Sequence, residues 1–257
     1  LEEAERLYRE ILEIEPTQLD ANNNLGVLLQ ASNRLEEAEK IFKKAIELKP
    51  DFAEAHYNLG NILHNLKKFE EAEKSYKKAI EFKPDYAEAY HNLGNTLFEL
   101  KRFNDAEKNL KKTIELKPDF FEGHFGLSNF FYHIGKFKES AEGYRHLTIL
   151  KPNHVGAHNN LGNALYSLGK MEEARIVFLK ALELKPDHAE SHNNLGCILY
   201  ALGKFDDAAK CYQKAIELKP DYIDALYDFA VVQHTLKQYK KASDMFKSIN
   251  HKSSQSY

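Results

Sequence analysis

The chain of 257 residues contains 36 Lys and Arg against 39 Asp and Glu, which gives a formal net charge of -3. This near balance gives no reason to expect binding to nucleic acid or to an anionic membrane surface. Hydrophobic residues make up 43% and charged residues 29%, a composition typical of a folded protein. No window approaches 18 consecutive apolar residues, so we expect no segment that inserts into a membrane.

Seven prolines divide the chain at a constant interval. Each lies 34 residues after the one before it: Pro16, Pro50, Pro84, Pro118, Pro152, Pro186 and Pro220. Proline cannot continue a helix, so we expect a helix to end just before each one. A constant period indicates that one supersecondary unit is copied along the chain.

The repeats follow one another in chain order. Residues 1–18 predict only the second helix of a truncated repeat, because Leu1, Ala4, Tyr8 and Pro16 keep its register. Six full repeats are then expected at 19–52, 53–86, 87–120, 121–154, 155–188 and 189–222. Residues 223–250 predict a degenerate or capping repeat, with truncation of a longer array as the alternative, and 251–257 a polar tail.

Apolar spacing within one repeat predicts two helices. We number the positions of every repeat from 1, so that residue 53 is position one of repeat 53–86. Ala55, Leu59 and Ile62 begin one apolar stripe, and Phe69 and Ala72 begin a second one after two lysines. Glycine recurs at position eight and alanine at position twenty, where large side chains would push the two helices apart.

These residues resemble the tetratricopeptide repeat, which has a 34-residue period. Asn58-Leu59-Gly60, Ala72 with Tyr76, and Pro84 follow its pattern in order, while His56 stands where the family often has Trp. The resemblance covers nearly the whole chain. It implies an all-α, right-handed superhelix (a solenoid) of about seven antiparallel helix pairs plus an N-terminal half repeat, with the first helices lining a concave groove.

The repeat at 121–154 departs most from this pattern. Gly126 and Ser128 replace the usual Asn and Gly, and Ser140 and Leu147 replace Ala. Either the neighbouring side chains repack around these changes, or the curvature of the superhelix changes locally.

Asparagines recur at two positions that the resemblance places in the groove. Asparagine is a poor residue for a helix interior, so a repeated row of it needs a reason. Its carboxamide both donates and accepts, and it can therefore hold a peptide backbone, as similar ladders do in the O-linked N-acetylglucosaminyl transferases. The alternative is that these amides bond only between repeats. The expected peptide-binding residues are Asn24, Asn58, Asn92, Asn160 and Asn194 at position six, Asn61, Asn95, Asn129 and Asn163 at position nine, and Tyr57, His91, Tyr166 and Tyr200 at positions five and twelve.

Charge narrows the expected ligand. No Lys or Arg occurs in any expected first helix, whereas position two is acidic in most repeats: Asp20, Glu54, Glu88, Glu122, Glu190 and Asp224. The acidic row also suits the helix dipole. A desolvated carboxylate on a ligand needs fixed cations, so we expect a neutral or basic extended segment instead.

Nothing in the sequence predicts catalysis or a cofactor. Of the 12 histidines, His154 with His158 and His188 with His192 have four-residue spacing, but no accompanying carboxylate motif supports a metal site. Cys197 and Cys211 lack metal or redox spacing, and we expect both to be small packing residues in a cytoplasmic protein.

Three functions fit these features. The first is an adaptor or scaffold that binds a protein or peptide partner. The second is the substrate-recognition arm of a larger, glycosyltransferase-like enzyme whose catalytic domain is absent from this sequence. The third is a structural scaffold that self-associates through its terminal repeats.

Overall fold

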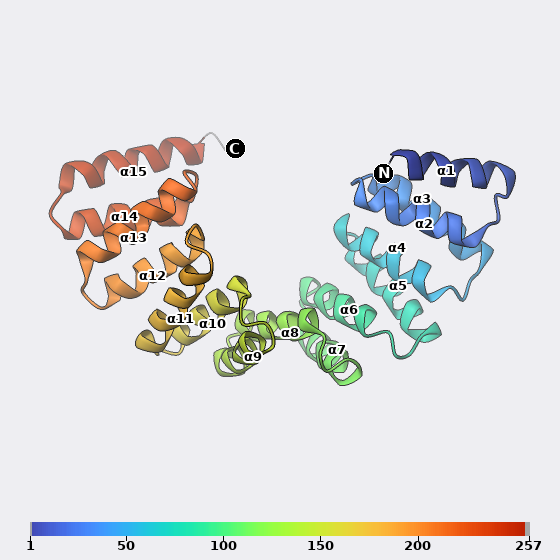
Figure 1. Cartoon of the computed structure of the whole chain (residues 1–257), viewed down its shortest axis with the longest axis horizontal. Helices are drawn as coiled ribbons and strands as arrows, with labels where there is room; N and C mark the ends of the chain where they lie inside the picture. The colour runs from blue at the N-terminus through green and yellow to red at the C-terminus, as the bar shows by residue number, and fades with distance from the viewer. Residues whose placement is uncertain (1, 255–257) are drawn as a thin grey trace. The chain divides into compact units, whose positions relative to one another are not determined.

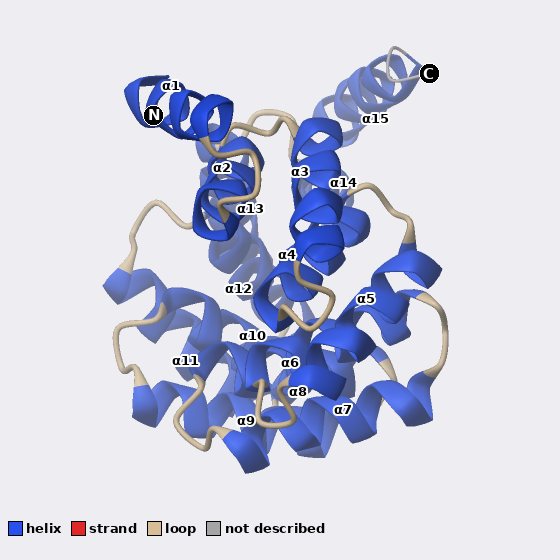
Figure 2. Cartoon of the chain, turned by 90° about the vertical axis from the view of Figure 1, so that its right-hand side faces the viewer, coloured by secondary structure: helices blue, strands red, loops and turns tan. Residues whose placement is uncertain are grey.

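The computed structural model describes the backbone of residues 2–254 and the side chains of residues 2–247 and 249. Within this range the chain forms fifteen α-helices joined by short loops, with no β-strand (Figures 1 and 2). The helices are α1 (Glu2–Ile14), α2 (Leu19–Ala31), α3 (Leu35–Leu48), α4 (Ala53–Asn65), α5 (Phe69–Phe82), α6 (Ala87–Glu99), α7 (Phe103–Leu116), α8 (Phe121–His133), α9 (Phe137–Leu150), α10 (Val155–Ser167), α11 (Met171–Leu184), α12 (Ala189–Ala201), α13 (Phe205–Leu218), α14 (Ile223–Thr235) and α15 (Tyr239–Ser254). The all-α fold expected from the sequence is confirmed.

The ends of the helices follow from the punctuation in the sequence. Helix α3 ends at Leu48, two residues before Pro50, and α5 ends at Phe82, two residues before Pro84. The turn between the two helices of a repeat contains a residue in the left-handed region, such as Lys67 with φ 58° or Gly169 with φ 73°. This turn reverses the chain, so that the two helices of a repeat pack against each other. Helix α15 continues through residues 251–254, where we expected a polar tail, and residues 255–257 lie outside the described part.

Close approach of the two helices depends on glycine at position eight in five of the repeats. A Cβ added to Gly60 would lie 2.6 Å from Cε1 of Tyr76, whose side chain is 1% exposed. In repeat 155–188 the same relation holds between Gly162 and Phe178 at 2.5 Å. The ring therefore occupies the space that a side chain on the first helix would need, and the pair fixes the helix spacing.

In five repeats the side chain at position four forms a hydrogen bond to the loop before that repeat. The Nε2–H of His56 donates to the carbonyl of Pro50 at 2.9 Å, six residues earlier. The same six-residue bond joins His124 to Pro118, His158 to Pro152, His192 to Pro186 and Asn22 to Pro16. A proline carbonyl at the end of a helix has no helical partner, so this side chain satisfies it. The histidine row is therefore a structural feature of the loops.

Ion pairs connect successive repeats along the second helices. Glu5 pairs with Arg34 at 2.7 Å, Glu39 with Lys68 at 3.0 Å, and Glu73 with Arg102 at 2.7 Å. The two partners are always 29 residues apart, which places each cation in the turn of the following repeat. In each pair the carboxylate is more buried than the cation. The pKa values of Glu5 and Glu39 are lowered, mainly by hydrogen bonds from these cations and from neighbouring basic side chains.

The chain divides into two compact units, unit 1 (Leu1–Phe130) and unit 2 (Phe131–Tyr257). In unit 1 the unusual residues of repeat 121–154 fit their neighbours. A Cβ on Gly126 would lie 2.5 Å from Cε1 of His91, and one on Gly123 would lie 2.8 Å from Cγ2 of Thr113. Here larger side chains on α6 and α7 fill the space left by glycine on α8, which supports repacking as the explanation for these two departures.

Candidate functional site

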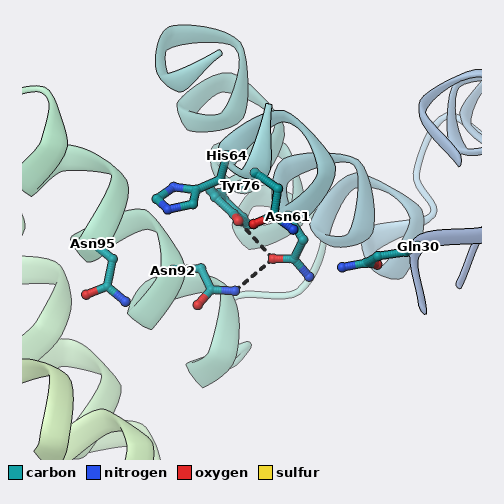
Figure 3. Close-up of a pocket in the computed structure, with 7 residues that line it drawn as sticks. Gln30, Asn61, His64, Tyr76, Asn92 and Asn95 are labelled. Carbon is teal, nitrogen blue, oxygen red and sulfur yellow. Dashed lines mark hydrogen bonds between the residues drawn. The ribbon is translucent and has the colours of Figure 1, made fainter. Parts of the chain in front are cut away.

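The first helices of unit 1 form an open pocket of about 230 Å³ whose lining is almost entirely polar and uncharged. Figure 3 shows the side chains that α2, α4, α5 and α6 direct into it. The lining residues are Gln30, Asn61, His64, Asn65, Tyr76, Asn92 and Asn95. Burial lowers the pKa of His64, so its imidazole is neutral at pH 7 and adds no charge to the pocket.

Asn61 is the centre of the hydrogen bonds in this pocket. Its Oδ1 accepts from the hydroxyl of Tyr76 at 2.8 Å and from Nδ2 of Asn92 at 2.7 Å (Figure 3). The Asn92 amide also donates to the hydroxyl of Tyr57 at 3.2 Å. Among the described residues, no hydrogen bond within 3.5 Å involves Asn61 Nδ2 or Asn92 Oδ1, although the Asn61 amide lies near the Tyr57 hydroxyl and opposes the rise in pKa that burial causes there.

His91 occupies the next step of the row. Its Nε2 accepts from Nδ2 of Asn95 at 3.1 Å, and its ring meets Phe120 edge-on with centroids 5.8 Å apart. Burial lowers the pKa of His91, and its Nδ1 is buried without a hydrogen-bond partner. Since the ring lies against Gly126, it fills the place where a position-six asparagine would stand.

Unit 2 repeats the arrangement with different residues. Nδ2 of Asn194 donates to Oδ1 of Asn159 at 3.1 Å and to Oδ1 of Asn163 at 2.9 Å. Asn159 also accepts from the hydroxyl of Ser191 at 3.0 Å. Asn194 Oδ1 and Asn163 Nδ2 are without a partner in the described part of the chain. The amide of Asn160 donates to the Tyr144 hydroxyl at 3.2 Å.

One rule therefore describes the ladder in both units. The side chain at position six donates to positions five and nine of the repeat before it. Asn58 follows the rule with Asn23 at 3.2 Å, Asn92 with Tyr57 and Asn61, and Asn194 with Asn159 and Asn163. The bonds between repeats that the sequence left open as an alternative are present, and they use one side of each amide.

The structure places the other expected site residues as follows. Asn24 is exposed, and Tyr166 is 41% exposed. The Tyr200 hydroxyl shares a hydrogen bond of 3.2 Å with Thr235. Asn129 lies half-exposed on α8.

Sequence reasoning missed Asn23 and Asn159, although they share position five with Tyr57 and His91. Cys197 packs against the core cluster that contains Tyr212 and Phe229, as the sequence predicted. The Cys197 thiol stands at position nine, its Sγ lies 3.4 Å from Oδ2 of Asp228, and burial raises its pKa to about 12. Comparing position five across all repeats would have found the two asparagines.

Lysines from the loops pair with three members of the acidic row at position two. Lys83 reaches Glu54 at 3.4 Å, Lys117 reaches Glu88 at 2.9 Å, and Lys219 lies 3.8 Å from Glu190. The same lysines lie over the rings of Tyr86, Phe120 and Tyr222, with the nitrogen 4.5 to 5.1 Å from the ring centre. The first helices carry no Lys or Arg of their own. The rim, meaning the edge formed by the position-two row, is therefore not basic, and the charges of its three paired carboxylates are neutralised.

No group of three or more His, Cys, Asp or Glu side chains that could hold a metal ion occurs within the described range. His154 and His188 accept hydrogen bonds from the backbone N–H groups of Ala157 and Ser191 at the starts of α10 and α12. No helix in that same range is both long and apolar enough to cross a membrane.

Profiles of the tetratricopeptide repeat match residues 1–47, 31–67, 60–101, 87–120, 155–221 and 199–256. The chain belongs to the tetratricopeptide repeat family. The matched ranges leave out 121–154, the repeat whose residues depart most from the pattern. Tetratricopeptide repeat proteins generally mediate protein–protein interaction and scaffolding, and modules of this kind are typically non-catalytic.

Solved structures of tetratricopeptide repeat proteins share this fold. PilF of Pseudomonas aeruginosa is 22% identical with a TM-score of 0.69, over 80% of this chain and 94% of its own. A tetratricopeptide repeat protein of Parabacteroides merdae is 18% identical with a TM-score of 0.67, over 89% and 91%. A chain of the Cut9–Hcn1 hetero-tetramer of the APC/C is 16% identical with a TM-score of 0.72, and the match covers 90% of this chain and 46% of that one. A sequence search of curated proteins gave no match.

Proposed function

We propose that the first helices of each unit bind an extended, neutral or basic polypeptide segment, and that the protein acts as an adaptor or scaffold. The observation that carries this proposal is the half-used state of the ladder amides. Bonds between repeats consume Oδ1 at position nine and Nδ2 at position six, and they hold the side chains in place. What remains is a free donor on Asn61 and a free acceptor on Asn92, with the same pair on Asn163 and Asn194.

A donor beside an acceptor matches a peptide backbone, because each residue of an extended chain offers one N–H and one C=O. The amides are already immobilised by their bonds to the neighbouring repeat, so binding costs little further side-chain entropy. Backbone contacts would make the surface tolerant of ligand sequence. Likeness to other solved tetratricopeptide repeat proteins supports the interaction role, since members of the family are generally interaction modules.

The charges around the first helices favour a neutral or basic ligand over an acidic one. A ligand carboxylate would meet no free cation on the first helices, because the nearby lysines are held by Glu54, Glu88 and Glu190. An acidic segment would therefore lose hydration without gaining a charged partner. A neutral or basic segment meets amides, hydroxyls and carboxylates, all of which suit it.

The first test removes the position-six row, replacing Asn58, Asn92, Asn160 and Asn194 by Ala. We expect binding of a fluorescent 12-residue Ser/Thr/Ala peptide, followed by anisotropy, to be abolished while helical content stays intact. Each amide lost contributes about 0.5–1.5 kcal/mol. A control variant replaces asparagines away from the first helices, namely Asn104, Asn109 and Asn153.

A second variant separates binding from stacking. Asn61→Asp with Asn163→Asp keeps the oxygen that accepts from the neighbouring repeat but removes the free donor. We expect weaker binding of the neutral peptide with an unchanged unfolding midpoint. Unchanged affinity in both the alanine and the aspartate variants would make the ladder a purely structural device.

A further inference from the structure

The ladder rule fails at its last step, between α12 and α14. Position six of repeat 223–250 is Asp228, and an ionised carboxylate cannot donate. The position-five partner that should accept from it is Asn193, 35 residues earlier. Asn193 is only 5% exposed, and its Oδ1 is buried with no hydrogen-bond partner. Its Nδ2 reaches only the Cys197 sulfur at 4.0 Å.

The direction of this oxygen follows from the other steps. Asn23 Oδ1 accepts from Asn58, and Asn159 Oδ1 accepts from Asn194, each pair 35 residues apart. Asn193 stands in the same place relative to Asp228, and both side chains contact Cys197. By analogy with these steps, we infer that Asn193 Oδ1 is directed towards Asp228, and the one hydrogen-bond donor recorded beside Asp228 in the described residues is the weak Cys197 thiol.

Among the side chains that the structure describes, no cation pairs with the carboxylates on α14. Asp224 and Asp228 are four residues apart on one helix, so they lie on the same face. At position two, Glu54, Glu88 and Glu190 each pair with a lysine 29 residues later, whereas the residue 29 positions after Asp224 is a serine. Neither Asp224 nor Asp228 forms an ion pair within the described residues. Asp228 is half-buried, and burial, followed by the charge of Asp224, raises its pKa against the opposing effect of the Cys197 hydrogen bond.

We propose that Asn193, Asp224 and Asp228 form a subsite that takes the basic side chain of the bound segment, and arginine in preference to lysine. This subsite rests on the function proposed above, since the side chain belongs to the extended ligand. It assigns that ligand a basic residue at the step between α12 and α14.

The chemistry of the acceptors favours a guanidinium. Its five N–H donors lie in a fixed plane, so one group can bond to a carboxylate and to a nearby amide oxygen together. The neighbouring titratable groups are Cys197 on α12, Tyr212 on α13 and Tyr222 before α14, and burial raises the pKa of all three. They are neutral at pH 7, and Lys241 of α15 lies over the ring of Phe229 with its Nζ 4.9 Å from the ring centre, so no ion pair with Asp228 is formed by the side chains that the structure describes.

The test compares two 12-residue peptides of Ser, Thr and Ala that differ at one central residue, arginine or its neutral isostere citrulline. We expect the full chain to bind the arginine peptide about tenfold more tightly, the size of a charge-assisted hydrogen bond. Asp228→Asn should remove this preference and leave the citrulline peptide unaffected. Asp221→Asn, an exposed aspartate in the turn before α14, is the matched control and should keep the preference. A lysine peptide should bind between the other two.

The outcomes separate the two proposals. Equal binding of arginine and citrulline peptides by the unaltered chain, or full preference in Asp228→Asn, would overturn the subsite while leaving the peptide-binding function in place. Failure of both peptides to bind would overturn both.

A measurement without ligand tests the missing donor directly. Asp228→Asn supplies an amide hydrogen to Asn193 Oδ1, so its thermal unfolding midpoint should rise above those of the unaltered chain and Asp221→Asn. An unchanged midpoint would contradict the unpartnered-acceptor argument.

Discussion

The step from α4 to α6 and the step from α12 to α14 follow the same repeat pattern but differ in their ladder residues, above all at position six, where one has Asn92 and the other Asp228. In the first, the Asn92 amide nitrogen closes bonds to Tyr57 and Asn61. In the second, Asp228 has an oxygen where that nitrogen would be, and Asn193 Oδ1 is left buried and unpartnered. The first step satisfies its own inner groups, whereas the second needs a donor from elsewhere.

This difference teaches how a repeat protein acquires a distinct site without a new fold. The repeat supplies the positions, and the bonds between repeats fix the side chains. A change from amide to carboxylate then converts a neutral step into one that has a charge and a missing donor. Exchanging the two chemistries is therefore the most direct experiment.

Asn92→Asp should destabilise unit 1 most. The new carboxylate would lie where Asn92 Nδ2 now stands, 2.7 Å from the oxygen of Asn61. We expect a loss of about 3 kcal/mol in the free energy of unfolding, measured with urea, because a charge is left partly buried and unpaired. Asn104→Asp on the exposed part of α7 should change stability little. A loss equal to that of the control would remove the basis of the comparison.

Gly126→Asn restores the repeat pattern at a step where the space is already filled. We expect it to cost about 2 kcal/mol, since its Cβ would lie 2.5 Å from the His91 ring. Adding His91→Asn should recover most of this loss, because the smaller side chain vacates the place. Urea unfolding of the single and double variants would measure the coupling energy between the two positions. If the two changes in the free energy of unfolding simply added, the expected rescue would be contradicted.

Asp228→Asn should stabilise unit 2 by about 1 kcal/mol at pH 7. Folding raises the pKa of Asp228. The contribution of its protonated carboxyl to the free energy of unfolding is therefore fully present below the unfolded pKa, and it is lost as the pH rises through the folded pKa. The gain over the unaltered chain should therefore shrink as the pH falls below 7 towards 4. Thermal unfolding of both proteins across this range would test it, and a gain that grows in acid would show the sign to be wrong.

Lys83→Met should have the smallest effect, less than about 1 kcal/mol, because its pair with Glu54 is half-exposed. This variant is useful as a test of binding, because removing Lys83 leaves the Glu54 carboxylate unpaired. A basic peptide should bind more tightly to this variant at low salt, and the difference should fade in 0.5 M salt. Lys78→Met, whose partner Glu81 lies on the second helix, is the control.

Much of the fold could be predicted because the proline period and the glycine at position eight act locally. Pro50 follows the end of α3, and Gly60 meets the Tyr76 ring as the small and large positions imply. Most other repeats have the same proline and the same pairing of a small residue with a large one. The family resemblance rested on the same residues.

The ladder was harder to predict because its bonds join residues 31 and 35 apart, on helices whose contact the sequence does not specify. Position six was identified, but Asn159 was overlooked, since aromatic residues or histidine stand at position five in four of the seven repeats. The six-residue bond from His56 to the Pro50 carbonyl was missed for a different reason. A histidine that serves the backbone looks the same in sequence as one that packs.

The direct contact of α2 with α4 and of α4 with α6 sets an interval. Packed helices lie about 8–10 Å apart, whereas an extended chain advances about 3.3 Å per residue. Within one unit, a segment lying across these helices would meet a ladder amide at roughly every third residue. A family of such segments would share a period of three in the residues that matter and would be free to vary between them.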